Sequence, residues 1–382
     1  MNVSKNYQIC TETVMDTSDP KILFDQKGRS NHFLHFHKYV KPNWSLLKDS
    51  PQQRLENKIR QIKAKSKDQE FDCILGLSGG LDSSYMLHKI VVEYNLKPLV
   101  FHVDAGWNSE IAVHNINKLV DKLNLDLFTE VINWEEIKNF QLAMFKSGVP
   151  HLDVPQDMAF IGILYRFAEK HNIKTILNGG NISTECINPP LNILYWPTDM
   201  TQVKDILKRY NNYKLKSYPF SSIYYSKIWI KFFRRIEVFK PLNYINYIQK
   251  DAIDELKTIY GWKPYSQKHF ESRFTRFFEG YWLPKRFGYD MRRNQLSSLI
   301  LTNQISRLDA IEKLKSPALD ETVANNEFSY IAKKLDIKTD ELLNYLEMPL
   351  KFYWDYSNQK RLFDIGEKIF IKLFNIQRGG AY

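Results

Sequence analysis

The fold follows from residues 71–85, FDCILGLSGGLDSSY. An apolar run at 73–77 leads into Ser78-Gly79-Gly80-Leu81-Asp82-Ser83-Ser84, and an amphipathic segment follows at 85–94. This order predicts a buried strand, a tight glycine turn and a helix. A glycine turn ahead of a helix N-terminus lets backbone N–H groups approach a phosphate closely, and the helix dipole favours the anion. We therefore predict an anion-binding loop at this turn.

The side chains of this loop suit a phosphate that carries a divalent cation. Ser78, Ser83 and Ser84 can donate hydroxyl hydrogen bonds. Asp82 is an acidic group beside an anion site, which is favourable when Mg²⁺ lies between the two. No Gly-Lys-Ser/Thr follows, and the third glycine of the dinucleotide fingerprint is missing, so two common phosphate loops are excluded. An ordinary glycine-rich turn is the structural alternative.

The motif SGGLDSS at residues 78–84 resembles the pyrophosphate loop (PP-loop) of ATP pyrophosphatases. That superfamily contains GMP synthetase, NAD synthetase, asparagine synthetase and the tRNA thiolases. The resemblance implies ATP and Mg²⁺ as cofactors and cleavage of ATP between its α and β phosphates. It also implies a phosphate cradle made of Ser78, Gly79, Gly80, Ser83 and Ser84, with Asp82 holding the metal.

Composition limits the class of protein. The chain has 382 residues, 43% of them hydrophobic and 14% aromatic, which predicts a globular protein of two or three domains. The net charge of +11 suits anionic partners such as nucleotides, nucleotide-linked substrates, nucleic acid or a membrane surface. Three scattered cysteines favour a reducing cytoplasm. The sequence shows no apolar leader and no run of 18 apolar residues, so we expect no signal peptide and no membrane span.

Strand and helix patterns alternate after the loop. Strands are predicted at 97–104, 125–132 and 174–178, and helices are predicted at 110–123, 134–145 and 158–170. The alternation predicts an α/β fold with a doubly wound, mainly parallel sheet. Ligands of such sheets lie beyond the carboxyl ends of the strands. Besides the loop, the polar residues predicted to converge there are Asp104, Asn178, Gly179, Gly180 and Asn181.

We predict three regions: an N-terminal lobe (1–50), a nucleotide-binding domain (51–250) with an insertion of loops and helices around 186–240, and a C-terminal helical region (251–382). Within the last region we expect helices at 296–314, 326–335 and 339–346. The lobe has the spacing of a zinc ribbon, but only one of the four cysteines is present. Cys10, His32, His35 and His37 offer possible ligands. Their spacing is unlike usual zinc pairs, so we expect the lobe to fold without metal.

Several motifs together resemble the N-acetyl sugar amidotransferases of lipopolysaccharide and flagellin-glycan biosynthesis. The matching segments are VMDTSDP (14–20), the loop, VDAGWN (103–108), PQD (155–157), NGGN (178–181) with Thr184-Glu185, KHFESRFT (268–275), LPKRFG (283–288) and Arg292-Arg293. The chain departs from the family where Thr13, Ser30 and Phe33 replace cysteines and where Gln295 replaces a common histidine. These departures leave the loop intact.

The resemblance implies a two-step reaction. An acetamido or carboxyl oxygen of the sugar takes the adenylyl group of ATP, and ammonia then displaces AMP. Candidate catalytic residues are Asp82, Lys268, Glu271 and Arg273, with Arg276, Arg292 and Arg293 as further phosphate ligands. Asp157 is a candidate second Mg²⁺ ligand, or a helix N-cap. Asp104 faces the adenosine or caps a turn, and residues 178–181 bind ATP or form a tight turn.

Partners are predicted from what the chain lacks. No cysteine lies at the N-terminus or in a Gly-Cys-Gly elbow, so we expect ammonia from a separate glutaminase subunit. The expected acceptor is a nucleotide-linked N-acetyl sugar. Two alternatives stay open: a tRNA-modifying PP-loop enzyme, which the charge and the basic aromatic segment 268–293 would suit, and a non-catalytic nucleotide-binding scaffold. No cysteine pair is placed to carry sulfur, and nucleic acid is the less favoured partner.

Overall fold

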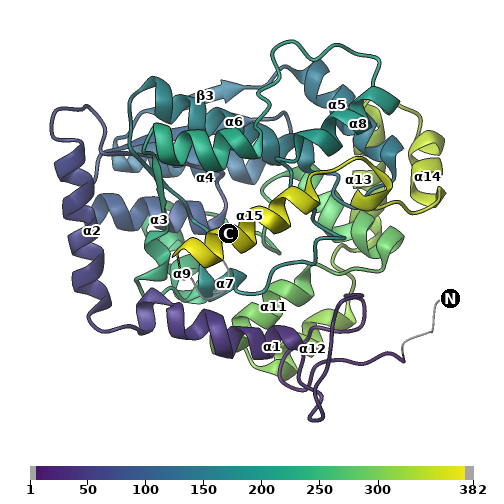
Figure 1. The fold of residues 1–382 in the computed structure, drawn as a ribbon, viewed down its shortest axis with the longest axis horizontal. Coiled ribbons are helices and arrows are strands. Elements are labelled where there is room, and N and C mark those ends of the chain that lie inside the picture. The colour runs from purple at the N-terminus through teal and green to yellow at the C-terminus, as the bar shows by residue number, and fades with distance from the viewer. Residues whose placement is uncertain (1–5, 375–382) are drawn as a thin grey trace.

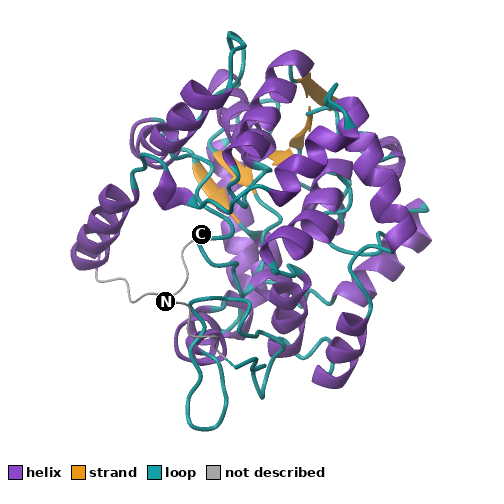
Figure 2. Ribbon diagram, turned by 90° about the vertical axis from the view of Figure 1, so that its right-hand side faces the viewer, coloured by secondary structure: helices purple, strands orange, loops and turns teal. Residues whose placement is uncertain are grey.

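A parallel sheet lies at the centre of the protein, inside a shell of helices (Figure 2). The computed structural model describes residues 6–374. The strands are β1 (Cys73–Gly76), β2 (Pro98–Asp104), β3 (Leu127–Val131), β4 (Thr175–Leu177) and β5 (Glu237–Phe239). Their order is β3-β2-β1-β4-β5, and every neighbouring pair is parallel. The predicted α/β class and doubly wound sheet are confirmed.

The α-helices are α1 (Asn31–His35), α2 (Pro51–Lys65), α3 (Leu81–Val92), α4 (Glu110–Leu123), α5 (Trp134–Ser147), α6 (Val154–Lys170), α7 (Ile182–Glu185), α8 (Met200–Tyr210), α9 (Gln249–Tyr260), α10 (Arg273–Phe277), α11 (Arg292–Leu301), α12 (Arg307–Lys315), α13 (Glu321–Lys334), α14 (Thr339–Glu347) and α15 (Lys360–Phe374). Wider π-helical turns form η1 (Phe36–Val40), η4 (Tyr224–Phe233) and η6 (Phe278–Phe287). The 3₁₀ turns are η2 (Lys41–Asn43), η3 (Ser45–Leu47), η5 (Pro241–Asn243) and η7 (Tyr353–Asp355).

Several predicted helices differ from the structure in their bounds; the helix expected at 326–335, for example, is α13, which begins at Glu321. The helix expected at 85–94 begins at Leu81, directly after the glycine turn, and the helix expected at 158–170 begins at Val154. The helix expected at 296–314 is two helices, α11 and α12, separated where Asn303 adopts a left-handed conformation (φ 59°). Strand β5 was missed, because its three residues are too few to show an alternating pattern.

Alternate residues of each strand pack against helices on opposite faces of the sheet. Ile74 belongs to the apolar core on the side of α5 and α6, and its neighbour Leu75 belongs to the core on the side of α2, α3, α4 and α9. Both side chains are fully buried. Burial of such a side chain contributes about 1.5–3 kcal/mol to folding, so the two-sided sheet fixes the strand register strongly.

The order in which strands are added to the sheet reverses between β1 and β4. The chain leaves β1 toward β2 on one side, whereas β4 lies on the other side of β1. Connections therefore diverge at the carboxyl ends of β1 and β4, which is where ligands of doubly wound sheets bind. The glycine loop after β1 and residues 178–181 after β4 both lie at this point. The topology thus places the predicted loop at the switch point.

The N-terminal lobe packs on the C-terminal helices, and Figure 1 shows its purple trace beside α11 and α12. Arg293 forms an ion pair with Asp16 (3.0 Å), and Arg307 donates to the carbonyls of Cys10 and Thr13. Val14 lies in a small apolar core shared with α11 and α12. These contacts anchor the lobe to the rest of the protein.

The possible zinc ligands of the lobe have other partners. The Cys10 sulfur accepts from the Ser30 amide at 3.2 Å, and His32 Nε2 lies 2.8 Å from Asp19 Oδ2. Over residues 6–374, no group of three or more His, Cys, Asp or Glu side chains is placed to hold a metal ion. The expectation that the lobe folds without metal stays a prediction.

The division at residues 50 and 250 stays a prediction. The second boundary falls inside α9, whose Ala252, Leu256 and Tyr260 belong to the core beneath the sheet. In the described part of the chain, no helix combines the length and the apolar character needed to cross a bilayer.

Candidate functional site

The loop after β1 has the backbone geometry that a phosphate cradle needs. Gly79 has φ +79°, and a Cβ there would lie 2.7 Å from the carbonyl oxygen of Ala112. No L-residue side chain is tolerated at this position without strain. Ser78 Oγ accepts from the Gly80 amide at 3.2 Å and lies 3.2 Å from Ser83 Oγ. The loop therefore holds two hydroxyls together ahead of the N-terminus of α3, where the helix dipole favours an anion.

Ser84 contacts the core behind the loop. Its side chain is fully buried, and its hydroxyl accepts from Trp262 Nε1 at 3.2 Å. Its amide donates to Gly80 O in the first turn of α3. These contacts fasten α3 to the core, and the place of Ser84 in a phosphate cradle stays a prediction.

A buried ammonium links two carboxylates beside the loop. Lys268 Nζ lies 2.6 Å from Asp82 Oδ2 and 2.7 Å from Glu185 Oε1, and it donates to Thr184 Oγ1 at 2.9 Å. The Tyr247 hydroxyl donates to Asp82 Oδ1. We call Asp82, Lys268 and Glu185 the acid–lysine triad. It joins the loop after β1, the segment after β4 and the segment before α10.

Burial and charge set the protonation of the triad. Burial alone would lower the pKa of Lys268, but Asp82 and Glu185 outweigh it and raise that pKa above its ordinary value. Burial would raise the pKa of Glu185, but the charge of Lys268 dominates and lowers it. The pKa of Tyr247 is raised well above 10 by burial and by Asp82. Lys268 and Glu185 therefore favour each other's charged forms, and Tyr247 stays a hydrogen-bond donor to Asp82.

Glu271 lies directly against the glycine loop. Its Oε1 accepts from Ser78 Oγ at 3.2 Å, and a Cβ built on Gly80 would lie only 2.5 Å from that oxygen. Burial raises the pKa of Glu271. The backbone holds it there, because Glu271 O accepts from the Ser109 amide at 2.9 Å. The carboxyl therefore lies against Ser78 and Gly80 of the glycine loop.

His269 stands two residues before Glu271. Burial would lower the pKa of its imidazole, but Glu279, at 3.0 Å from Nδ1, raises it to about 10. The imidazole is thus a cation at neutral pH. The positive charge of His269 lowers the pKa of Glu271 and so offsets part of the increase that burial causes.

Arg273 and Arg276 are not placed at the loop. Arg273 donates to Glu327 Oε1 at 2.8 Å, and Arg276 binds the same oxygen. The Arg273 guanidinium also lies 3.4 Å from the ring centre of Tyr330. Glu327 is buried, so these pairs join α10 to α13. These contacts give Arg273 a structural role, and its catalytic role stays a prediction.

The paired arginines of α11 also have structural partners. Arg292 binds Asp290 through both Nε and Nη2, and Arg293 binds Asp16 and the carbonyl of Val14. These contacts position the C-terminal helices and the lobe.

The carboxyl ends of β2 and β4 border the loop with turn residues. Gly179 comes so close that its Cβ would lie 3.3 Å from the backbone of Asp82 and Ser83. Asn178 Oδ1 accepts from the Gly180 amide (2.8 Å), and Asn181 caps α7. Asp104 Oδ1 accepts from the Gly106 amide at 2.7 Å. Residues 178–181 therefore lie against the start of α3, beside the glycine loop. The Asp104 carboxylate bonds within its own turn after β2.

Asp157 lies on a different contact network from the triad. Its Oδ2 is 3.0 Å from His151 Nε2. Close by, burial and Asp157 raise the pKa of Asp153 to about 7. Glu185, rather than Asp157, is the second carboxylate beside Asp82. The prediction of Asp157 as a Mg²⁺ ligand therefore gains no support from its contacts.

The residues present fit a Mg²⁺ that arrives with a nucleotide. Asp82 and Glu185 supply hard carboxylate oxygens within 2.7 Å of one ammonium. Mg²⁺ in nucleotide sites uses one or two carboxylates, keeps several waters and takes phosphate oxygens. Such a site needs no cage of three protein ligands, and within residues 6–374 no group of three or more His, Cys, Asp or Glu is placed as one.

Two residues of the site were missed at the sequence level. Glu185 stood within a family motif, and its place directly after the β4 loop was the available signal. Tyr247 lies in a segment of aromatic residues with no distinguishing pattern, 165 positions from Asp82 along the chain.

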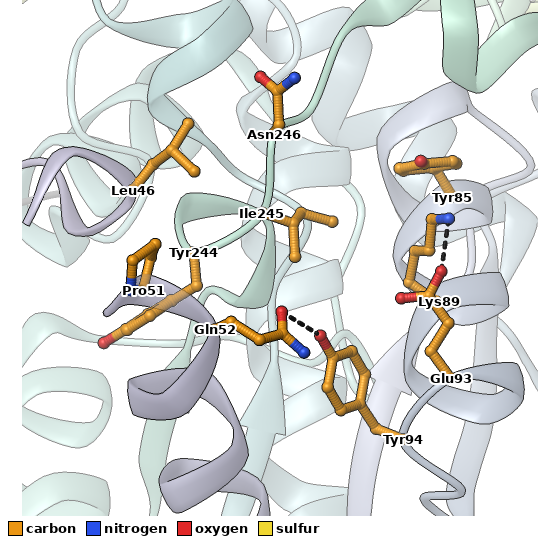
Figure 3. Close-up of a pocket in the computed structure, with 10 residues that line it drawn as sticks. All are labelled: Leu46, Pro51, Gln52, Tyr85, Lys89, Glu93, Tyr94, Tyr244, Ile245 and Asn246. Atoms are coloured by element: carbon orange, nitrogen blue, oxygen red, sulfur yellow. Dashed lines mark hydrogen bonds and ion pairs between the residues drawn. The ribbon is translucent and has the colours of Figure 1, made fainter. Parts of the chain in front are cut away.

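A cavity of about 330 Å³ opens beside α3 (Figure 3). It lies between the start of α2, the outer side of α3 and residues 244–246. Tyr85 lines it and stacks on Tyr247, with ring centres 5.3 Å apart. The stacked rings of Tyr85 and Tyr247 therefore separate the cavity from the triad. Residues of the glycine loop do not line the cavity.

The sequence was then compared with known proteins. Residues 271–370 match the C-terminal domain of WbpG-like lipopolysaccharide biosynthesis proteins. The resemblance to lipopolysaccharide biosynthesis proteins is thus confirmed over this segment, which contains Glu271, α10 and α13. No curated protein matches the chain.

Solved structures with some likeness include three enzymes. They are NMN synthetase from Francisella tularensis (13% identity, TM-score 0.34, 80% of this chain and 99% of that chain covered), NH3-dependent NAD synthetase from Campylobacter jejuni (15%, 0.29, 78% and 98%) and the U34-tRNA thiolase NcsA from Methanococcus maripaludis (13%, 0.36, 80% and 82%). These likenesses are too weak to assign an activity.

Proposed function

We propose that the protein is an ATP-dependent amidotransferase of lipopolysaccharide or related glycan biosynthesis. Its acceptor is an N-acetyl sugar, carried by a nucleotide, whose acetamido or carboxyl group receives nitrogen. The observation that carries the proposal is the acid–lysine triad beside the glycine loop. The family match over residues 271–370 supports the pathway.

In the first step, the acetamido oxygen attacks the α-phosphorus of ATP and pyrophosphate leaves. The glycine loop, with the hydroxyls of Ser78 and Ser83, would bind the departing diphosphate, and the 3.2 Å contact between these two hydroxyls supports this role. Asp82 and Glu185 would hold Mg²⁺, which neutralises phosphate charge. Lys268 already neutralises these carboxylates and can donate to a phosphate oxygen when the metal takes its place.

In the second step, ammonia attacks the activated carbon, the carbon–oxygen bond to AMP breaks, and an amidine or amide forms. The attacking ammonia must lose a proton. Glu271 lies against the glycine loop with a pKa above its ordinary value because of burial, so it can exchange a proton with a reacting group. We infer that Glu271 acts as the acid–base residue.

We further propose that ammonia comes from a separate glutaminase subunit and that the reaction takes place in the cytoplasm. Cys10 and Cys73 are buried, and burial raises the pKa of Cys73 and Cys186, which disfavours a nucleophilic thiolate. This supports an external ammonia source.

The test measures release of pyrophosphate and AMP with ATP, ammonium and a nucleotide-linked N-acetyl sugar. Release that needs both ammonium and the sugar supports the proposal. Asp82→Ala and Lys268→Met should each lower kcat at least about 100-fold, because each removes charge at the phosphates. Lys315→Met is the matched control, since its ammonium is exposed and pairs only with Glu312 of the same helix. Release without the sugar, or full activity in Asp82→Ala, would refute the proposal.

A further inference from the structure

The segment at residues 206–236 is the most one-sided part of the chain in charge. It contains eight Lys and Arg and no Asp or Glu, and nine aromatic residues lie among them. The π-helical element η4, Tyr224–Phe233, lies within it, directly before β5. The site described above uses none of these residues.

The inner face of η4 is tied to α6 through one carboxylate. Glu169 accepts from the Tyr225 hydroxyl at 2.8 Å and from Trp229 Nε1 at 3.0 Å, and it pairs with Arg234 Nε at 2.9 Å. Ile230 is buried on the same side. The element is therefore fixed on the body of the protein, and its outer face has a defined orientation.

The outer face exposes large apolar side chains. Phe233 is 63% exposed, Tyr224 57%, Phe232 54% and Ile228 43%. Side chains of this size in water cost free energy, and a cluster of them on one element marks a binding surface. We call these four residues, with Lys227, Lys231 and Arg235, the η4 surface.

Cations cluster on this surface and repel one another. The pKa of Lys227 lies below its ordinary value because the surrounding protein desolvates it and because Lys231 and Lys240 are close. Arg235 is exposed at the end of the element. The surface therefore combines positive potential with apolar side chains, and an anionic apolar partner would satisfy both.

We propose that the η4 surface docks the protein on an anionic lipid bilayer. The apolar rings enter the boundary between headgroups and acyl chains, and the lysines and arginines lie at the phosphates. A basic face beside Trp and Phe is typical of elements that lie in this interface. The inference does not depend on the proposed reaction, because it uses a surface outside the glycine loop and the triad.

The composition favours a bilayer over a protein or RNA. Lysine is depleted at protein–protein interfaces, whereas here it alternates with aromatic residues. RNA contacts rely on stacking, which Ile228 cannot provide, and the apolar side chains point outward together.

The test is co-sedimentation of the full chain with vesicles of phosphatidylcholine alone or mixed with phosphatidylglycerol. We expect binding to the anionic vesicles only, weakened by salt. The pair Lys227→Gln, Arg235→Gln should lower the vesicle affinity about fivefold per cation. The pair Phe232→Ser, Phe233→Ser should lower it at least about tenfold. Leu308→Ser is the matched control, because Leu308 is 78% exposed on α12, outside the η4 surface.

Melting temperatures should be equal in all variants, since the changed side chains are exposed. The charge pair keeps the apolar face, so it tests the inference even if the phenylalanine pair folds poorly. Binding to both vesicle types alike, no binding, or unchanged binding of the charge pair would overturn the inference. Self-association or tRNA binding that is lost with the η4 variants, without vesicle binding, would also overturn it.

Discussion

The strongest residue-scale feature of the site is a carboxyl placed against a phosphate loop. Glu271 contacts Ser78, and the groups that face it include His269, Asp82 and Tyr265. A carboxylate there would repel the phosphates of ATP, whereas a neutral carboxyl could donate a hydrogen bond to them. Burial raises the pKa of Glu271 toward the range where this choice matters.

We therefore predict that ATP binding weakens as pH rises. Below its raised pKa Glu271 is protonated and does not repel phosphate, and above it the carboxylate does. The dissociation constant of MgATP should increase in the wild type as the pH rises through the raised pKa of Glu271. Glu271→Gln should remove this part of the pH dependence. Calorimetry measures the dissociation constant of MgATP for both proteins at each pH. Protonation of ATP itself affects both proteins equally, so a Glu271→Gln profile parallel to the wild-type profile would contradict the prediction.

Gly79 is a second residue whose conformation can be tested. Gly79→Ala should destabilise the fold by more than the roughly 1–2 kcal/mol that a left-handed alanine costs, because its Cβ would also collide with Ala112. Gly261→Ala separates the two effects, since Gly261 has φ +67° and nothing lies within 4 Å of its Cβ position. Urea unfolding measures both. Equal losses would show that the loop can move away from α4.

At the scale of elements, the basic residues of 268–293 act mainly between helices. Glu327 of α13 receives both Arg273 and Arg276 of α10 while buried. Removing one partner of a buried ion pair leaves an unpaired charge. The two helices are thus held by a contact that a sequence motif of phosphate-binding arginines would not reveal.

Because of this contact, we expect substitution of Arg273 to lower the stability of the fold and to leave ATP binding unchanged. Arg273→Ala should lower the free energy of unfolding by about 3 kcal/mol, because Glu327 keeps only one partner. The KM for ATP should stay at its wild-type value in the folded fraction. Arg60→Ala is a suitable control, since Arg60 is exposed on α2 and hydrogen-bonds Asn57 of its own helix. A raised KM for ATP without loss of stability would contradict this prediction and would indicate that Arg273 acts in catalysis.

How much of the fold could be predicted depended on element length. Residues 73–85 predicted β1, the glycine turn and α3 because strand, breaker and helix patterns follow one another directly. Strand β5 was hidden, because three residues within a basic aromatic insertion carry no period. The order β3-β2-β1-β4-β5 comes from pairing between distant segments, which periodicity does not encode.

The site could be predicted only in part, because only some of its residues lie in a local sequence motif. Asp82 and the glycines carry a local motif, so their place at the switch point followed from the strand they end. The roles of Lys268 and Arg273 could not be separated, because both lie in one basic segment, and only the fold shows that Lys268 meets Asp82 while Arg273 meets Glu327.

At the scale of the whole molecule, the N-terminal lobe has the spacing of a zinc ribbon but only one of its four cysteines, so other contacts must hold it together. Cys10, Thr13 and Ser30 are completely buried, and the Cys10 sulfur accepts from the Ser30 amide. Arg307 closes the arrangement from α12 by donating to Cys10 O and Thr13 O. The lobe is thus joined to the C-terminal helices by hydrogen bonds that include a charged donor, each worth about 1.5–3 kcal/mol.

Chelation should therefore leave the stability of the protein unchanged, whereas Arg307→Ala should lower its free energy of unfolding by about 2–3 kcal/mol. Arg60→Ala is the matched control, because Arg60 is exposed on α2 and contacts only Asn57 of that helix. Urea unfolding of metal-free protein with and without EDTA measures the first effect, and limited proteolysis of the lobe reports its release in Arg307→Ala. Since the lobe packs on the helices that follow the triad-bearing segment, its release should also lower ATP turnover. A loss of stability on chelation would instead mean that the lobe binds a metal through Cys10 and its histidines.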